Sequence, residues 1–133
     1  MFASASPEAL IEILRSSIVQ LVRRDGPDLS ARQLAVLLTC YVSEEAQTVR
    51  GLSAALGVSK PAITRALDWL SEFDLVRRKI DPADRRSVLV QRTVDGLSFI
   101  RDLQSILAEA ASASTNAPAA SAVRPRLEVH AFT

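Results

Sequence analysis

The sequence is poor in the residues from which disulfides, metal sites and acid–base centres are built. It has one Cys, Cys40, and one His, His130, among 133 residues. No internal disulfide can form, and a single His without neighbouring Cys or carboxylate ligands is not a metal site. The sequence also lacks a glycine-rich phosphate loop, a nucleophile–base set and a paired-carboxylate signature. We therefore expect neither an enzyme nor a bound cofactor.

Long hydrophobic runs are missing as well. The longest nearly apolar run, residues 34–42, is far shorter than the ~20 residues needed to span a bilayer. The N-terminal segment contains Glu8 and Glu12 but no early basic residue, which does not fit a secretion signal. These features predict a cytoplasmic protein without a membrane partner.

Net charge is close to zero, but the basic residues are unevenly distributed. The total is +1, whereas residues 59–92 hold eight basic and five acidic side chains, a local balance of +3. The segments before and after this stretch each sum to −1. A polyanionic partner is therefore expected to bind at residues 59–92.

Helix-capping residues divide the chain into five expected helices. Ser6, Ser30, Thr48, Ser59 and Thr93 are the predicted N-caps. The expected helices cover residues 7–22, from 30 onward, 49–56, from 59 to about 73, and from 93 to about 113. Two strands are expected at residues 75–80 and 87–91, joined by a basic tip at residues 81–86. The small residues and prolines beyond residue 113 predict one domain, 1–113, followed by a low-complexity tail, 114–133.

The third and fourth helices have the features of a helix-turn-helix. Gly57 tolerates the backbone conformation that the tight turn needs. Ile63, Ala66, Leu67 and Leu70 follow helical spacing and are expected to face inward. Polar residues on the outer face, taken alone, are equally consistent with a solvated surface. The basic hairpin that follows favours a "wing" beside a recognition helix.

These residues resemble the MarR/SlyA group of bacterial winged-helix transcription regulators. The family's wing pattern is Asp-x-Arg, five residues, Leu-Thr and then Gly, and it is matched here by Asp84-Arg85-Arg86, Thr93 and Gly96. The stretch SKPAITRALDWL is similar to the family's recognition helix. The resemblance covers residues 30–97. It implies a mainly α winged helix-turn-helix fold with a small β-hairpin and a DNA-binding core at 30–93.

The same resemblance implies a sequence-specific regulator that binds double-stranded DNA. The recognition helix, 59–73, would enter the major groove, and the wing, 75–91, the minor groove. Arg86 would insert into the minor groove beside Arg85, with its guanidinium held by Asp84. Thr48 would offer helix N-terminal N–H groups to a phosphate. The residues expected to face the major groove are Ser59, Lys60, Pro61, Thr64 and Arg65.

Three positions depart from the family pattern or invite a second role. Arg92 stands where the family usually has Leu, so we expect an exposed strand end or an added phosphate contact. Asp74 replaces the usual Gly, and Asp tolerates the left-handed region better than most residues. Cys40 lies in the most apolar helix, which favours a buried, inert thiol over an oxidant sensor.

Partners other than DNA follow from the first and fifth helices. Both helices carry more apolar residues than one domain of this size can cover, which predicts a homodimer on a palindromic operator. No sixth helix, the family's usual dimerisation element, is recognisable.

By analogy, a small aromatic ligand is a candidate partner, in a cavity lined by Tyr41 and Trp69. The alternative function is a winged-helix module that binds an acidic protein rather than DNA.

Overall fold

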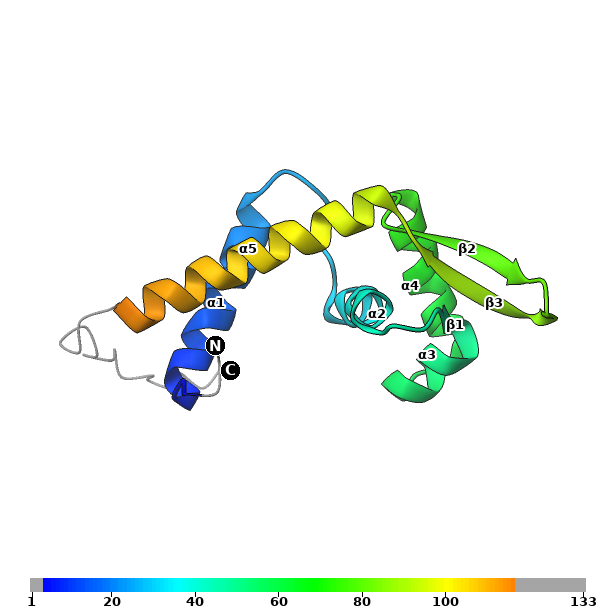
Figure 1. The fold of residues 1–133 in the computed structure, drawn as a ribbon, viewed down its shortest axis with the longest axis horizontal. Coiled ribbons are helices and arrows are strands. Elements are labelled where there is room, and N and C mark those ends of the chain that lie inside the picture. The colour runs from blue at the N-terminus through cyan, green and yellow to red at the C-terminus, as the bar shows by residue number, and fades with distance from the viewer. Residues whose placement is uncertain (1–3, 117–133) are drawn as a thin grey trace, which may run out of the picture.

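The computed structural model describes residues 4–116 as five helices and a three-stranded sheet (Figure 1). Within the described residues the elements follow one another as α1 (Pro7–Arg23), α2 (Ala31–Val42), β1 (Gln47–Thr48), α3 (Val49–Leu56), α4 (Lys60–Glu72), β2 (Val76–Asp81), β3 (Asp84–Arg92) and α5 (Val94–Asn116). The mainly α winged fold expected from the sequence is confirmed. The helix α5 continues past the predicted domain boundary at residue 113 and ends at Asn116. The rest of the predicted tail, residues 117–133 with His130, lies outside the described residues.

Hydroxyl side chains begin the helices at the predicted positions. Ser6 accepts from the N–H of Ala9 at 3.1 Å. Ser30 and Gln33 form the predicted capping box, with reciprocal hydrogen bonds of 3.1 and 2.8 Å. These bonds satisfy N–H groups that a helix start otherwise leaves without partners. They therefore fix where each helix begins.

The sheet differs from the prediction in two ways. Its strand order is β1-β3-β2, and the two-residue β1, which pairs with β3, was not expected. The hairpin is also longer than predicted, because Asp81 pairs with Asp84 and only Pro82 and Ala83 form the turn. Asp81 Oδ1 accepts from the N–H of Ala83 at 2.9 Å, which closes the turn locally. The predicted basic tip at 81–86 is therefore wrong: Arg85 and Arg86 lie within β3.

The main core lies between α2, α3, α4 and the base of the sheet. In Figure 1, α2 is seen end-on near the centre, and it contacts α3, α4, α5 and β3. All four predicted inward positions of the recognition helix are buried. Burying each large aliphatic side chain stabilises the fold by about 1.5–3 kcal/mol. The fully buried members of this core are Val36, Leu37, Leu52, Ile63, Leu67, Leu70 and Val76.

Two residues adopt left-handed backbone conformations where the sequence required them. Gly57 ends α3 with φ +67°, and Asp74 has φ +56° between α4 and β2. The prediction that Asp can replace Gly at this second turn is confirmed. Both turns reverse the chain tightly, so that α3, α4 and the hairpin pack as neighbours.

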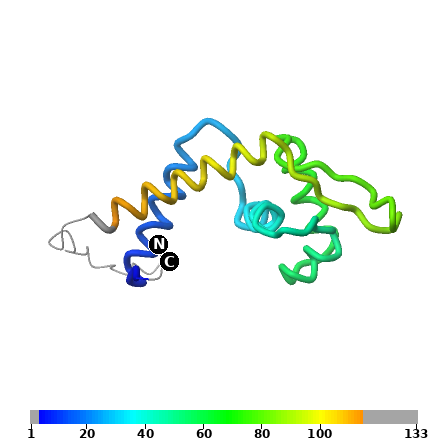
Figure 2. Tube along the Cα trace, in the orientation of Figure 1, coloured from blue at the N-terminus to red at the C-terminus, as the bar shows by residue number. Residues whose placement is uncertain are grey.

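The first and last helices pack against each other away from the wing, as Figure 2 shows. A separate small cluster of Ile13, Ala110 and Ala111 joins them. Phe99 and Leu103 of α5 are buried, but Leu97 is 40% exposed. The N-terminal end of α5 is thus less buried than its middle. Several apolar side chains of α1 also remain exposed: Leu10, Ile11, Leu14, Ile18 and Val22.

Among residues 4–116, no helix combines the length and the apolar composition that crossing a bilayer requires.

Candidate nucleic-acid interface

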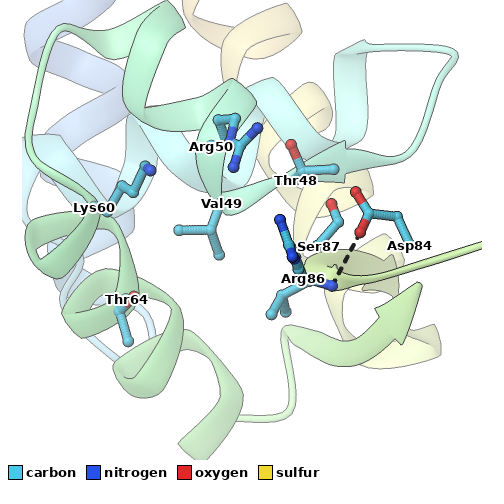
Figure 3. A pocket seen from close by; sticks show the side chains of 9 residues that line it. Thr48, Val49, Arg50, Lys60, Thr64, Asp84, Arg86 and Ser87 are labelled. Carbon is cyan, nitrogen blue, oxygen red and sulfur yellow. Dashed lines mark hydrogen bonds between the residues drawn. The ribbon is translucent and has the colours of Figure 1, made fainter. Parts of the chain in front are cut away.

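A hollow of about 230 Å³ lies between α3, α4 and the wing (Figure 3). Lys60 and Thr64 project into it from α4, and Arg86 projects from β3 on the other side. The hollow therefore brings the recognition helix and the wing to one surface, as the sequence predicted for a winged helix. Its lining residues are Thr48, Val49, Arg50, Lys60, Thr64, Asp84, Arg86, Ser87 and Val88.

Helical spacing decides which residues of α4 reach this hollow. Lys60 and Thr64 are four positions apart and so share one face of the helix. Arg65 is rotated away and lines a different groove, formed with the N-terminal turn of α2 and Trp69. Of the residues predicted to face the major groove, the structure places Lys60 and Thr64 opposite the wing but does not bring Arg65 there.

Ser59 and Pro61 shape the start of α4 rather than line the hollow. The Ser59 side chain is the N-cap and accepts from the N–H of Ala62 at 3.3 Å. Pro61 lies in the first turn, where its missing N–H costs no helical hydrogen bond. Both residues are exposed at the tip of the helix.

The alternation of strand residues separates Arg86 from Arg85. Successive side chains of a strand point to opposite faces. Asp84, Arg86 and Val88 therefore share the face that lines the hollow, whereas Arg85 is not among its lining residues. Both arginines are exposed. The sequence placed both at the tip of the wing and assigned the groove insertion to Arg86, and only Arg86 lines the hollow.

Asp84 does not hold the guanidinium of Arg86, so that expectation is wrong. Its Oδ1 accepts instead from the main-chain N–H of Arg86, at 3.1 Å (Figure 3). This bond shapes the strand just after the turn and leaves the Arg86 side chain unbound to Asp84. Within residues 4–116, Arg86 has no ion pair.

Helix α3 contributes the third wall of the hollow. Thr48 is its N-cap, and the side-chain oxygen accepts from the N–H of Gly51 at 2.9 Å. The first-turn N–H groups of Val49 and Arg50 have no acceptor within the helix. Arg50 was not singled out in the sequence. The signal available was its position two residues after a helix N-cap, where its charge adds to the positive end of the helix dipole.

The wing and α4 are also joined by an ion pair. Arg78 of β2 lies 2.6 Å from the carboxylate of Asp68. Asp68 lies on the exposed side of the recognition helix, and its partner explains why an acidic residue is placed among cations. An exposed pair of this kind contributes only about 0–1 kcal/mol to stability.

Cys40 is buried, as predicted, with 5% of its surface exposed. Burial raises the pKa of the thiol to about 11, and the positive charge of Arg92 offsets part of that rise. A thiol with this pKa stays protonated near neutral pH and is a poor nucleophile. The arrangement fits the inert thiol expected from the sequence.

A separate apolar cavity of about 280 Å³ lies between α1, α2 and α5. Neither Tyr41 nor Trp69 lines it, contrary to the suggested ligand cavity. Trp69 packs on Phe73 instead, with 4.5 Å between the ring centroids. The cavity is lined by Ile18, Leu21, Val22, Pro27, Asp28, Leu29, Leu34 and Phe99.

A helix-turn-helix followed by a hairpin beside its second helix defines a winged-helix domain. Within that class, residues 29–88 match the model of the MarR family. Over these residues the chain is similar to the MarR family.

Solved structures share this winged-helix fold. A crystal structure of MarR is 29% identical, with 77% of this chain and 75% of that chain covered and a TM-score of 0.59. A MarR mutant from E. coli is 24% identical, covers 88% of both chains and has a TM-score of 0.62. The S. aureus MepR–DNA complex is 20% identical, with 77% and 78% covered and a TM-score of 0.61.

Proposed function

We propose that this protein is a sequence-specific regulator of transcription that binds double-stranded DNA. The observation that carries the proposal is the hollow in which Lys60, Arg50 and Arg86 approach from three different elements. A duplex presents phosphates on both sides of each groove, and cations on separate walls of one surface can bind phosphates of both strands. The similarity of residues 29–88 to the MarR family supports the same function, and the S. aureus MepR structure is itself a DNA complex.

In the proposed complex, α4 and its N-cap (residues 59–73) occupy the major groove, and the wing (75–91) follows the adjacent minor groove. Thr64 and Lys60 face the base edges, while Ser59, Pro61 and Arg65 lie at the exposed start and flank of the helix. Arg86 enters the minor groove, where a narrow groove concentrates negative potential. The N-terminus of α3 at Thr48, together with Arg50, binds a phosphate beside the major groove.

We propose that the working form is a homodimer. The exposed apolar side chains of α1, among them Ile11 at 67% and Val22 at 63%, support this interface. Two-fold pairing of these helices would present two recognition helices to successive turns of a duplex, roughly 34 Å apart. The operator is then palindromic.

A small anionic aromatic ligand is the proposed effector, and its site is the apolar cavity between α1, α2 and α5. The guanidinium of Arg24 lies 5.1 Å from the centre of the Phe99 ring, and Phe99 lines this cavity. One nitrogen of Arg24, NH1, is buried without a hydrogen-bond partner among the described residues. Arg24 NH2 already pairs with Asp102 at 3.2 Å, and an anionic group on a ligand would satisfy the remaining NH1. Titration with benzoate and with neutral benzyl alcohol, followed by a thermal shift, tests this: only the anion should stabilise the protein.

The decisive experiment is selection of bound fragments from random duplex DNA, followed by fluorescence anisotropy on the recovered sequence. We expect a palindromic motif and an affinity that falls steeply with salt, because bound phosphates release counterions. If the protein ignores duplex DNA even at low salt, the alternative of a protein-binding winged-helix module replaces the proposal.

A further inference from the structure

The hydroxyl of Tyr41 lies where α2, the wing and α5 meet. It donates to the carbonyl of Leu75 at 2.8 Å and accepts from the N–H of Thr93 at 3.0 Å. Leu75 immediately precedes β2, and Thr93 lies between β3 and α5. One oxygen atom of α2 therefore ties together both strands of the wing at their base and the start of α5.

The side chain of Thr93 completes this connection. Its hydroxyl donates to the carbonyl of Asp74 at 2.6 Å and accepts from the N–H of Gly96 at 2.8 Å. The residue pairs that these bonds link, Asp74 with Thr93 and Tyr41 with Leu75, are distant in sequence. The bonds therefore fix tertiary geometry rather than a local turn.

Gly96 shows how closely the first turn of α5 approaches Tyr41. A Cβ atom at this position would lie 1.8 Å from the Tyr41 hydroxyl oxygen and 2.2 Å from the carbonyl oxygen of Leu75. Neither contact is sterically allowed, and the Leu75 oxygen belongs to the backbone. The helix thus reaches the wing's base without an intervening side chain.

Arg92, at the end of β3, holds the tyrosine ring from the other side. Its Nε donates to the carbonyl of Cys40 at 3.2 Å, and its NH2 group donates to the carbonyl of Ser43. Its guanidinium carbon lies 5.6 Å from the centre of the Tyr41 ring. The carbonyls at the C-terminus of a helix lack helical partners, and a cation there is favourable. Arg92 is exposed, as expected from the sequence, but its guanidinium binds the C-terminal end of α2, a contact that was not expected.

We infer that Tyr41 is a positioning residue for the wing: its hydroxyl sets where Arg86 lies relative to the recognition helix. This inference rests on the proposed DNA-binding function. Arg86 is six positions from Arg92 along β3, or roughly 20 Å at ~3.3 Å per residue. A small rotation at the base is therefore enlarged at Arg86. Nearer its tip, the hairpin is held by the two-residue pairing of β1 with β3 at Val90 and Leu89. The exposed Arg78–Asp68 pair adds little stability, and Arg86 lies beyond the β1 pairing.

The test is a double-mutant cycle with Tyr41→Phe, which removes only the hydroxyl and keeps the ring beneath Arg92. Duplex affinity is measured for wild type, Tyr41→Phe, Arg86→Ala and the double variant. We expect Tyr41→Phe to weaken binding roughly tenfold in the wild-type background and to have almost no effect after Arg86→Ala, since contacting or coupled residues are non-additive. The matched control is Thr64→Ala, in which the same tenfold loss should persist.

Equal losses in the Arg86→Ala and Thr64→Ala backgrounds would show a general effect on the domain and would overturn the inference. So would an unchanged affinity of Tyr41→Phe. A wild-type protein that binds no duplex would instead reject the proposed function.

A measurement without DNA distinguishes a failure of the positioning role of Tyr41 from a failure of the proposed DNA-binding function. Hydrogen exchange followed by mass spectrometry should show faster exchange of the wing's amides, residues 76–92, in Tyr41→Phe, with exchange in α4 unchanged. Thr93→Val, which removes the hydroxyl bonds to Asp74 and Gly96, serves as the second variant and should give the same pattern. Unchanged wing exchange in both variants would contradict the positioning role whatever the protein binds.

Discussion

The carboxylate of Asp68 and the guanidinium of Arg78 form a 2.6 Å ion pair that connects the recognition helix to the first strand of the wing. The pair leaves Arg86, on the other strand, free of acidic partners within the described residues. The cations that face the hollow and those that hold the fold are therefore different residues. This division allows the interface to be tested by mutation without dismantling the domain.

Arg86→Ala is expected to weaken duplex binding by on the order of 1–3 kcal/mol across all sequences, because a minor-groove arginine reads groove shape and charge. Fluorescence anisotropy with a specific and a random duplex measures both losses. Arg85→Ala is the matched control, since it removes the same charge from the opposite face of β3 and should cost less. An Arg86→Ala variant with wild-type affinity would remove Arg86 from the interface.

Thr64→Ala should change base preference while leaving the fold intact, since Thr64 is exposed on the face of α4 that lines the hollow. Binding selection on the variant should return a motif altered at one position of each half-site. Arg65→Ala was expected from the sequence to behave in the same way. Because Arg65 lines a different groove, we expect its variant to alter the motif less. Identical motifs from both variants and wild type would reject α4 as the reading helix.

Arg50→Ala should reduce affinity by a similar factor for every duplex and lower the salt dependence by about one counterion. The measurement is the slope of log affinity against log salt concentration. Arg32→Ala, an exposed arginine of α2 outside the hollow, is the control and should leave the slope nearly unchanged. A wild-type slope for Arg50→Ala would exclude the phosphate contact.

Cys40 gives the structure a predicted pH dependence. Its pKa is about 11 in the folded protein against an ordinary value of 9.0. Between these values the unfolded chain loses the thiol proton while the folded protein retains it, so stability should fall as pH rises from about 9 to about 11. Chemical denaturation of wild type and Cys40→Ala across this range isolates the effect. Parallel curves for the two proteins would show that the thiol does not contribute.

The local features of this fold were largely readable from the sequence, because they depend on neighbouring residues. Ser30 with Gln33 fixed one helix start, and the spacing of Ile63, Ala66, Leu67 and Leu70 identified the buried face of α4. The two-residue strand β1 was missed because two residues carry no periodic pattern. The turn at Pro82 was predicted too long because a bond from Asp81 to Ala83 tightens it.

The long-range contacts could not be predicted in this way. Arg92 was assigned to solvent or phosphate, yet its partners are carbonyls of α2, which lie 49 and 52 positions earlier in the sequence. Helical spacing puts Leu97 on one stripe with Leu103 and Ala110, but Leu97 is 40% exposed whereas those two residues are buried. Contacts between distant residues depend on how whole helices are rotated against each other. No short pattern in a single sequence indicates that rotation.

The length of α5 has a mechanical consequence. It runs unbroken for 23 residues, or about 34 Å at 1.5 Å per residue, from the base of the wing to the crossing with α1. Because Gly96 has no side chain, the first turn of α5 packs directly against the base of the wing. In the proposed homodimer, a rotation at the subunit contact would therefore be transmitted along α5 to the wing.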